Sequence, residues 1–218
     1  MSPFDSAGPV AAGAAATAVD RVADAVRAEI LTGALPADAP LREEAAAARY
    51  GVSRHTVRAA FQRLVAERLA IATPYRGVRV ASFDRETIIA LQQLRAALEV
   101  EAVRIARERF GREWPDSVLA PARAALDRLA ASADWLEAER EHAQFHHALV
   151  AASGSPRIIE AHAALGAELL LFLLRVQPHY TLESLVAEHR DLLDAVQSRG
   201  PEALREHLEH SMRLLVGG

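Results

Sequence analysis

The residues with the clearest chemical potential in this chain are its histidines. Eight of the nine lie after residue 140. His142 and His146 are four residues apart, so a helix would present both on one face, the spacing with which a helix gives two imidazoles to a metal ion. His189 stands before an apolar run further along the chain. Because such a pair is short and common, the alternative is that these histidines are solvated or hydrogen-bonded within a core.

A second chemically distinctive group is a cluster of arginines. Residues 49–79 contain seven arginines and one acidic residue, a charge of +6, whereas residues 85–218 carry −5 and the whole chain −4. All 25 basic residues are arginine. Local positive charge beside an acidic partner segment is typical of a small nucleic-acid-binding module joined to another domain.

The arginine cluster includes the pattern of a tight turn followed by a helix. Gly51 can adopt the positive φ of a sharp turn, and Ser53 is a good helix N-cap. Four apolar residues then follow at helical spacing and predict a buried stripe: Val57, Ala60, Phe61 and Leu64. The other face presents Arg54, His55 and Arg58 beside the helix N-terminus, which suits contact with phosphates and base edges in a DNA major groove. A solvated arginine face is the alternative, but the turn, the cap and the following segment favour the DNA-reading helix.

The neighbouring segments complete a winged helix-turn-helix over residues 18–82. We expect helices at about 19–31 and 42–50 before the DNA-reading helix, which extends over about 53–69. A β-hairpin is expected at about 71–73 and 78–81 with Arg76 and Gly77 at its tip. Residues 1–17 are rich in Ala and Gly and predict a disordered tail.

Residues 83–218 show only helical patterns, so the fold class expected is mainly α, with a C-terminal antiparallel bundle of about six helices. Asp84 is the expected N-cap of the first. The expected helices are 85–110, 115–131, 133–153, 155–176, 182–198 and 201–216.

Composition excludes several classes of protein. The absence of cysteine excludes disulfides, thiolate metal sites and thiol nucleophiles. No stretch reaches the roughly 18–20 apolar residues of a membrane span, and the N-terminus lacks the early positive charge of a secretory signal. We therefore expect a cytoplasmic protein that does not bind membranes.

The first half resembles the GntR superfamily of bacterial winged-helix repressors. The matching residues, within about 19–81, are Leu41, Glu43, Ala47, Tyr50 to Arg54, Val57, Arg58, Leu64, Leu69, Arg76, Gly77 and Val80. The second half resembles the FadR-like branch, with its helical effector domain called FCD. Its matching stretches are 94–99, 145–149, 152–157 and 188–195.

The resemblance implies a homodimeric, ligand-responsive transcription factor that binds operator DNA and is most often a repressor, not an enzyme. The expected effector is a small organic acid, bound by residues 83–218. The DNA-binding residues expected, from the resemblance and from the charge pattern together, are Ser53, Arg54, His55, Thr56, Arg58, Arg76 and Gly77.

Many relatives hold a divalent metal in the FCD domain through one Asp and three His. His146 and His189 fall on such ligand positions, but His142 replaces the Asp and Ser211 aligns with the last His. His207 lies one turn before Ser211 on the same face, and His210 is adjacent but turned away. We expect zinc or nickel bound by four residues: His142, His146, His189 and His207.

Two arginines, Arg95 and Arg140, are the candidates for pairing with an anionic effector through a bidentate fork. For each, the alternative is an ordinary ion pair at the surface or between helices. Two other functions stay open at this stage: a metal-dependent enzyme using the histidines, and a DNA binder that responds to no ligand.

Overall fold

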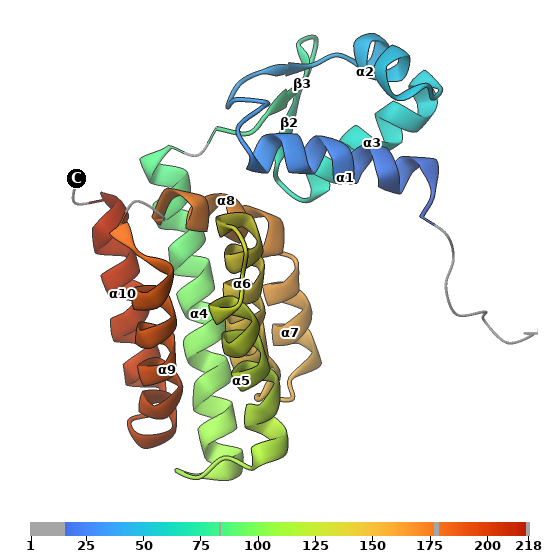
Figure 1. Ribbon diagram of the computed structural model, residues 1–218. Coiled ribbons are helices and arrows are strands. Elements are labelled where there is room, and N and C mark those ends of the chain that lie inside the picture. Colours follow the sequence, from blue (N-terminus) through green and yellow to red (C-terminus); the bar gives the residue numbers. More distant parts are fainter. Residues whose placement is uncertain (1–15, 83, 177–178, 217–218) are drawn as a thin grey trace, which may run out of the picture.

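The computed structural model describes residues 16–82, 84–176 and 179–216. Two units follow one another along the chain, a winged-helix unit and a helical unit (Figure 1). Strand β3 of the first ends at Val80, and helix α4 of the second begins at Arg85. Most of the tail expected over 1–17 lies outside the described residues. Thr17 is described, and it caps the first helix with a hydrogen bond from the Asp20 amide.

The winged-helix unit contains the three expected helices, which enclose one apolar core. They are α1 (Ala18–Leu31), α2 (Glu43–Tyr50) and α3 (Arg54–Ala66). The four residues of the predicted stripe on α3 are all buried, with Phe61 at 2% exposure. They pack against Val22, Val26 and Ile30 of α1. The packed inner face fixes which face of α3 is left for solvent.

Local interactions set the two ends of α3. Gly51 ends α2 in the left-handed conformation, with φ at 63°, and the Ser53 hydroxyl accepts a hydrogen bond from the Thr56 amide at 3.1 Å. At the other end, Arg68 has a φ of 56°, a conformation that favours glycine. Helix α3 therefore ends at Ala66, three residues earlier than the periodicity of the sequence predicts.

The sheet of this unit has three strands where the sequence predicted two. The expected hairpin is formed by β2 (Ala70–Thr73) and β3 (Gly77–Val80), and β1 (Pro40–Leu41) pairs antiparallel with β3. A strand of two residues is too short to produce an alternating pattern, so sequence reasoning missed it.

The helical unit contains seven helices within the described residues. Their bounds are α4 (Arg85–Phe110), α5 (Asp116–Ala130), α6 (Trp135–Ala151), α7 (Pro156–Ala163), α8 (Gly166–Val176), α9 (Leu182–Ser198) and α10 (Pro201–Val216). The expected mainly helical class is confirmed. The helix expected over 155–176 is two helices, because the chain leaves helical geometry between Ala163 and Gly166. None of the described helices is long and apolar enough to span a membrane.

Two contacts show that α4 and α6 run in the same direction. Glu99 on α4 bonds to His146 on α6, and ten residues further along α4, Arg109 donates to the carbonyl of Ser153, just past the end of α6. Helix α5 packs against α6, with a short turn between them. This arrangement decides which residues of α4 and α6 face each other inside the unit.

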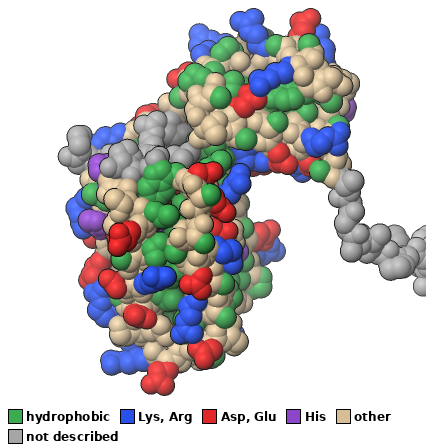
Figure 2. Space-filling view, viewed as in Figure 1, with side chains coloured by type: hydrophobic (Ala, Val, Ile, Leu, Met, Phe, Trp, Pro, Cys, Tyr) green, Lys and Arg blue, Asp and Glu red, His purple; other side chains and the backbone are tan. Residues whose placement is uncertain are grey.

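Helix α8, a part of the helical unit, packs against the winged-helix unit. It lies at the end of the helical unit that faces α1, and the space-filling view shows two lobes joined there (Figures 1 and 2). Leu171 of α8 packs against the core of the winged-helix unit and also against the apolar cluster of Ile88 and Leu91 on α4. Glu168 lies 3.8 Å from Arg68, which is two residues past the end of α3.

Phe61→Ala is expected to lower the free energy of unfolding of the winged-helix unit by about 3–5 kcal/mol, because it removes a buried aromatic ring and leaves a cavity. Urea unfolding followed by circular dichroism measures the loss. Gln62→Ala, which changes the exposed neighbour on the same helix, is the control and should stay within about 0.5 kcal/mol of the wild type. Equal effects of the two variants would contradict the packing described.

Candidate functional site

The outer face of α3 is the first candidate site. Ser53, Arg54, His55 and Arg58 are exposed, and Thr56 is partly exposed. The first turn of α3 directs unpaired backbone amides and the positive end of the helix dipole outward, so it attracts an anion. The face combines side-chain and backbone donors, as contact with phosphates and base edges requires.

Arg58 does not extend freely into solvent. Its Nε and one terminal nitrogen donate to the two carboxylate oxygens of Glu43 on α2, at 2.8 and 2.7 Å. This pair lowers the pKa of the Glu43 carboxyl, first through the hydrogen bond and then through charge. Because 61% of the Arg58 side chain stays exposed, Glu43 holds the guanidinium in position without covering it.

The tip of the wing is the second part of this surface. Arg76 and Gly77 are exposed, and Gly77 has a φ of 77°. Sequence reasoning missed Tyr75, whose ring is fully exposed and whose backbone has a φ of 64°. A tyrosine held outward at a strained turn offers a flat ring and a hydroxyl to a partner surface.

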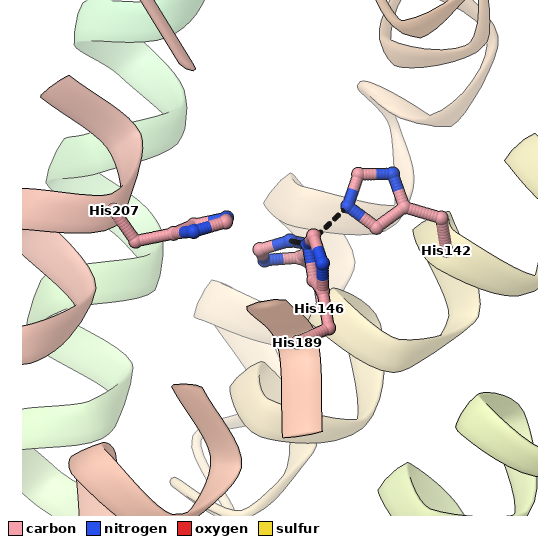
Figure 3. A group of neighbouring side chains, drawn as sticks. All are labelled: His142, His146, His189 and His207. Atoms are coloured by element: carbon pink, nitrogen blue, oxygen red, sulfur yellow. Dashed lines mark hydrogen bonds between the residues drawn. The ribbon is translucent and has the colours of Figure 1, made fainter. Parts of the chain in front are cut away.

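The second candidate site is a group of four buried histidines in the helical unit (Figure 3). His142 and His146 come from α6, His189 from α9 and His207 from α10. Each offers a ring nitrogen, and these four atoms all lie within 4.8 Å of one another. The His189 Nε2 is 2.6 Å from the Nε2 of His142 and 3.3 Å from that of His146. The structure thus brings together the four residues expected as metal ligands.

Oxygen atoms around the cluster fix the orientation of three of these rings. The Nδ1 of His189 donates to the backbone carbonyl of Leu185 at 2.8 Å, and the Nδ1 of His207 lies 2.9 Å from the carboxylate of Glu188. The Nδ1 of His146 bonds to Glu99. When Nδ1 carries the hydrogen, the Nε2 of a neutral imidazole keeps its lone pair for a metal.

Glu99 organises the surroundings of the histidines. Its carboxylate is completely buried, and it accepts from Arg95 at 2.6 Å, from His146 at 2.8 Å and from His162 at 3.0 Å. Burial alone would raise the pKa of Glu99, but the positive charge of Arg95 and the bonds from the two histidines hold it well below the usual range. The carboxylate therefore stays ionised and orients His146 from behind.

Burial keeps the central histidines neutral. It is the main cause that lowers the pKa of His142, His146 and His189 well below the usual range, and the charge of Arg95 lowers that of His142 and His146 further. Burial also raises the pKa of Glu139 to about 8. One carboxyl oxygen of Glu139 lies 3.6 Å from the Nδ1 of His142. The two groups do not form an ion pair, because both are uncharged at neutral pH. Neither this oxygen nor the Nδ1 of His142 has a hydrogen-bond partner among the described residues.

Comparison with known proteins identifies the chain. Residues 18–80 match the model for bacterial regulatory proteins of the gntR family, and residues 90–214 match the FCD domain. The HTH-type transcriptional repressor GlaR of Escherichia coli (strain K12) is 32% identical over 192 residues, 83% of this chain and 87% of that protein. The chain belongs to the GntR family of bacterial regulators, with an FCD domain.

Two further proteins similar to this GntR-family regulator are also transcriptional regulators. The "Probable D-xylose utilization operon transcriptional repressor" of Paenarthrobacter nicotinovorans is 28% identical over 89% of this chain and 85% of that protein. A crystal structure of a GntR transcriptional regulator from Rhodococcus sp. RHA1 has a TM-score of 0.74 at 28% identity, covering 92% of this chain and 98% of that one. Family membership identifies a transcriptional regulator and not an enzyme.

In the FCD domain of this GntR-family regulator, some of the residues predicted to bind metal or effector lie at the histidine cluster and others do not. His207 joins the histidine cluster, while His210 is exposed and Ser211 is buried one turn further along α10. Arg95 is buried beside the cluster, at 2% exposure. Arg140 is exposed, roughly 160° around α6 from His142. The structure therefore does not bring Arg140 to the site, because the spacing places its side chain on the outer face of the helix.

Sequence reasoning missed three residues around the histidines: Glu99, Glu139 and His162. Glu99 stood within the Leu94–Glu99 stretch of the family resemblance, but no spacing rule linked it to His146, 47 residues away. His162 is a lone histidine on a short helix, and its contact with Glu99 depends on how α7 packs against α4. Only the tertiary structure connects these residues.

The buried histidines predict a stability of the metal-free protein that depends on pH. Below pH 6.5 the unfolded chain binds protons that His142, His146 and His189 exclude in the folded state, so the free energy of unfolding decreases as the pH falls. Glu139 acts oppositely, because between pH 4.5 and 8 it loses its proton more readily in the unfolded chain. Each group contributes at most about 1.4 kcal/mol per pH unit, and three histidines outweigh one carboxyl.

The expected profile of unfolding free energy rises from pH 5 to about 6.5 and then declines slightly toward pH 8. Urea unfolding in the presence of a chelator, followed by tryptophan fluorescence, measures it, because Trp114 and Trp135 both lie in the helical unit. His210→Gln changes an exposed histidine and should preserve the profile. A flat profile between pH 5 and 6.5 would show that the buried histidines are not held neutral.

Proposed function

We propose that the protein is a homodimeric transcriptional repressor that binds operator DNA through α3 and the wing and releases it when a small carboxylate binds the FCD domain. The observation that carries the proposal is the outer face of α3, where the exposed donors surround a helix N-terminus while the inner face is packed. Two of the similar proteins, from Paenarthrobacter nicotinovorans and Escherichia coli, carry the name of transcriptional repressor. Leu94 of α4, 43% exposed, is an apolar side chain that a second copy of the chain would cover.

Seven residues are proposed to contact DNA: Ser53, Arg54, His55, Thr56, Arg58, Arg76 and Gly77. The α3 residues would lie in the major groove, and the wing tip would approach the backbone, where Gly77 has no side chain to obstruct phosphate contact. Glu43 would orient Arg58 toward the DNA, which lowers the entropy that the arginine loses on binding.

A divalent metal is proposed in the cluster of His142, His146, His189 and His207. The donor set fits such an ion: three rings have their outer nitrogens anchored to oxygen atoms, and the inner nitrogens converge. Four imidazoles with no carboxylate favour borderline ions such as zinc or nickel over magnesium or calcium. When bound, the metal would supply a Lewis-acidic contact for an effector oxygen.

The effector is proposed to be an anion. His142 stands where many relatives have Asp, so the four ligands bring no negative charge to a divalent ion. Arg95 adds positive charge beside them, which Glu99 balances. A carboxylate bound near Arg95 would offset part of the positive charge that the divalent ion brings to the site.

Arg58→Ala is expected to weaken operator binding by about 5- to 150-fold, the loss typical of a bidentate contact to a base. The duplex is one that the wild-type protein enriches from a random pool, and fluorescence anisotropy measures its affinity. Arg104→Ala removes the same charge from α4 and is the control. Unchanged affinity in Arg58→Ala would remove Arg58 from the DNA contacts, and sequence-indifferent, salt-sensitive binding by the wild type would indicate a non-specific DNA binder.

Purified wild-type protein is expected to contain about one zinc or nickel ion per chain by elemental analysis, because one cluster of four imidazoles provides one site. His146→Ala should lose the ion, and His210→Ala should keep it, because His210 lies outside the cluster. Trace metal in the wild type, together with no rise in melting temperature when zinc or nickel is added, would count against the site.

A further inference from the structure

A groove on the winged-helix unit separates the first turns of α2 from the wing. The tip of the β2–β3 hairpin lies beside α2 (Figure 1), and the groove between them has a volume of about 710 Å³. Arg54, at the start of α3, lines this groove, and so do Arg76 and Gly77 of the wing tip. The groove therefore joins the two elements that are proposed to meet DNA.

Two neighbouring carboxylates of α2 also line the groove, and they differ in their partners. Glu43 accepts two hydrogen bonds from Arg58, so its charge is already balanced within the protein. Glu44 is exposed and makes no side-chain hydrogen bond or ion pair within residues 16–82, 84–176 and 179–216. Because successive residues of a helix are turned by about 100°, the side of α2 that carries Glu44 differs from the side that Glu43 presents to α3.

The wall of α2 next to Glu44 is made of small side chains. Ala45 and Ala48 are exposed and line the same groove, and Gly77 stands on the opposite wall. Such residues leave room for a DNA strand, and the first helix of a helix-turn-helix lies across the DNA backbone. In a complex, the Glu44 carboxylate would therefore extend past the alanines toward the duplex.

The chemistry of a carboxylate limits what it can contact on DNA. The phosphates that attract Arg54 and Arg76 repel Glu44, and a charge that loses water without gaining a partner is costly. In the major groove, the hydrogen-bond donors are the N4 amino group of cytosine and the N6 amino group of adenine. Adenine carries the N7 acceptor beside its amino group, so cytosine is the base that suits Glu44 best.

We propose that Glu44 determines operator specificity by accepting a hydrogen bond from the N4 amino group of a cytosine in each half-site. The inference rests on the proposed function, in which α3 and the wing bind operator DNA, and it adds a residue that selects a base as an acceptor. On sequences without that cytosine, the same carboxylate meets phosphates and base acceptors, so it also weakens binding to the wrong DNA.

The test compares the base preferences of the full-length wild type with those of Glu44→Ala and Glu44→Gln. Each protein enriches duplexes from the same random pool, and fluorescence anisotropy at one salt concentration measures affinities for duplexes changed at single base pairs. The wild type is expected to prefer a C·G pair at one position of each half-site by about 5-fold or more. Glu44→Ala should lose this preference. Glu44→Gln should shift it toward an A·T pair, because an amide pairs with both N6 and N7 of adenine.

Glu86→Gln is the matched control. Glu86 is exposed and occupies the second position of α4, as Glu44 does in α2, so its replacement removes the same charge from the same place in a helix. Acidic residues there stabilise a helix through its dipole. Glu86→Gln should keep every base preference of the wild type, whereas a purely helix-stabilising role of Glu44 would change the stability of its variants and leave their preferences intact.

The proposal is overturned if either Glu44 variant keeps the preferences of the wild type at every position, or if the preference lost is for an A·T pair. It is also overturned if Glu44→Ala binds all duplexes more tightly by one common factor, since Glu44 would then act only by repulsion. In these cases the wild type still selects a sequence, so only the role of Glu44 is contradicted. A wild type that enriches no sequence contradicts the DNA-binding proposal as well.

Discussion

The buried, ionised carboxylate of Glu99 is the interaction on which the helical unit depends. A charge in a protein interior is tolerated only when close partners replace the water that it has lost, and Glu99 takes its partners from three helices: Arg95 from α4, His146 from α6 and His162 from α7. Satisfying one carboxylate therefore fixes α4, α6 and α7 relative to one another. The hydrogen bond between the His146 Nδ1 and Glu99 also turns the inner nitrogen of His146 toward the other histidines. Stability of the bundle and readiness of the site to bind an ion thus have a common origin.

The two sites of this GntR-family regulator are built by opposite means. The outer face of α3 carries its polar groups in solvent, and the packed stripe beneath them only holds the helix still. The histidine site holds its polar groups away from solvent, where each needs a specific neighbour. A surface that meets DNA can be assembled from one helix and a turn, whereas the buried site requires residues from α4, α6, α9 and α10.

This difference explains how much the sequence could predict. The winged helix, the boundaries of most helices and the exposed face of α3 follow from periodicity, caps and glycine positions, which are local properties. The placement of His207 in the cluster followed from its position one turn before Ser211 on the same face. Glu99 and His162 could not be found in this way, because their contacts join residues of α4, α6 and α7 that are far apart in the sequence. Strand β1 and the break between α7 and α8 were missed because each involves only two residues.

Leu171 of α8 belongs to two apolar clusters, one in each unit. Regulators built from separable domains can exchange them by recombination when each domain keeps a complete core. Here an exchange that brought a new FCD domain without a matching side chain at this position would leave a gap under the winged helix. An exchange that brought a different winged helix would remove the apolar residues against which Leu171 packs. The contact thus favours inheritance of the two domains as a pair, and substitutions under α1 and on α8 are constrained to change together.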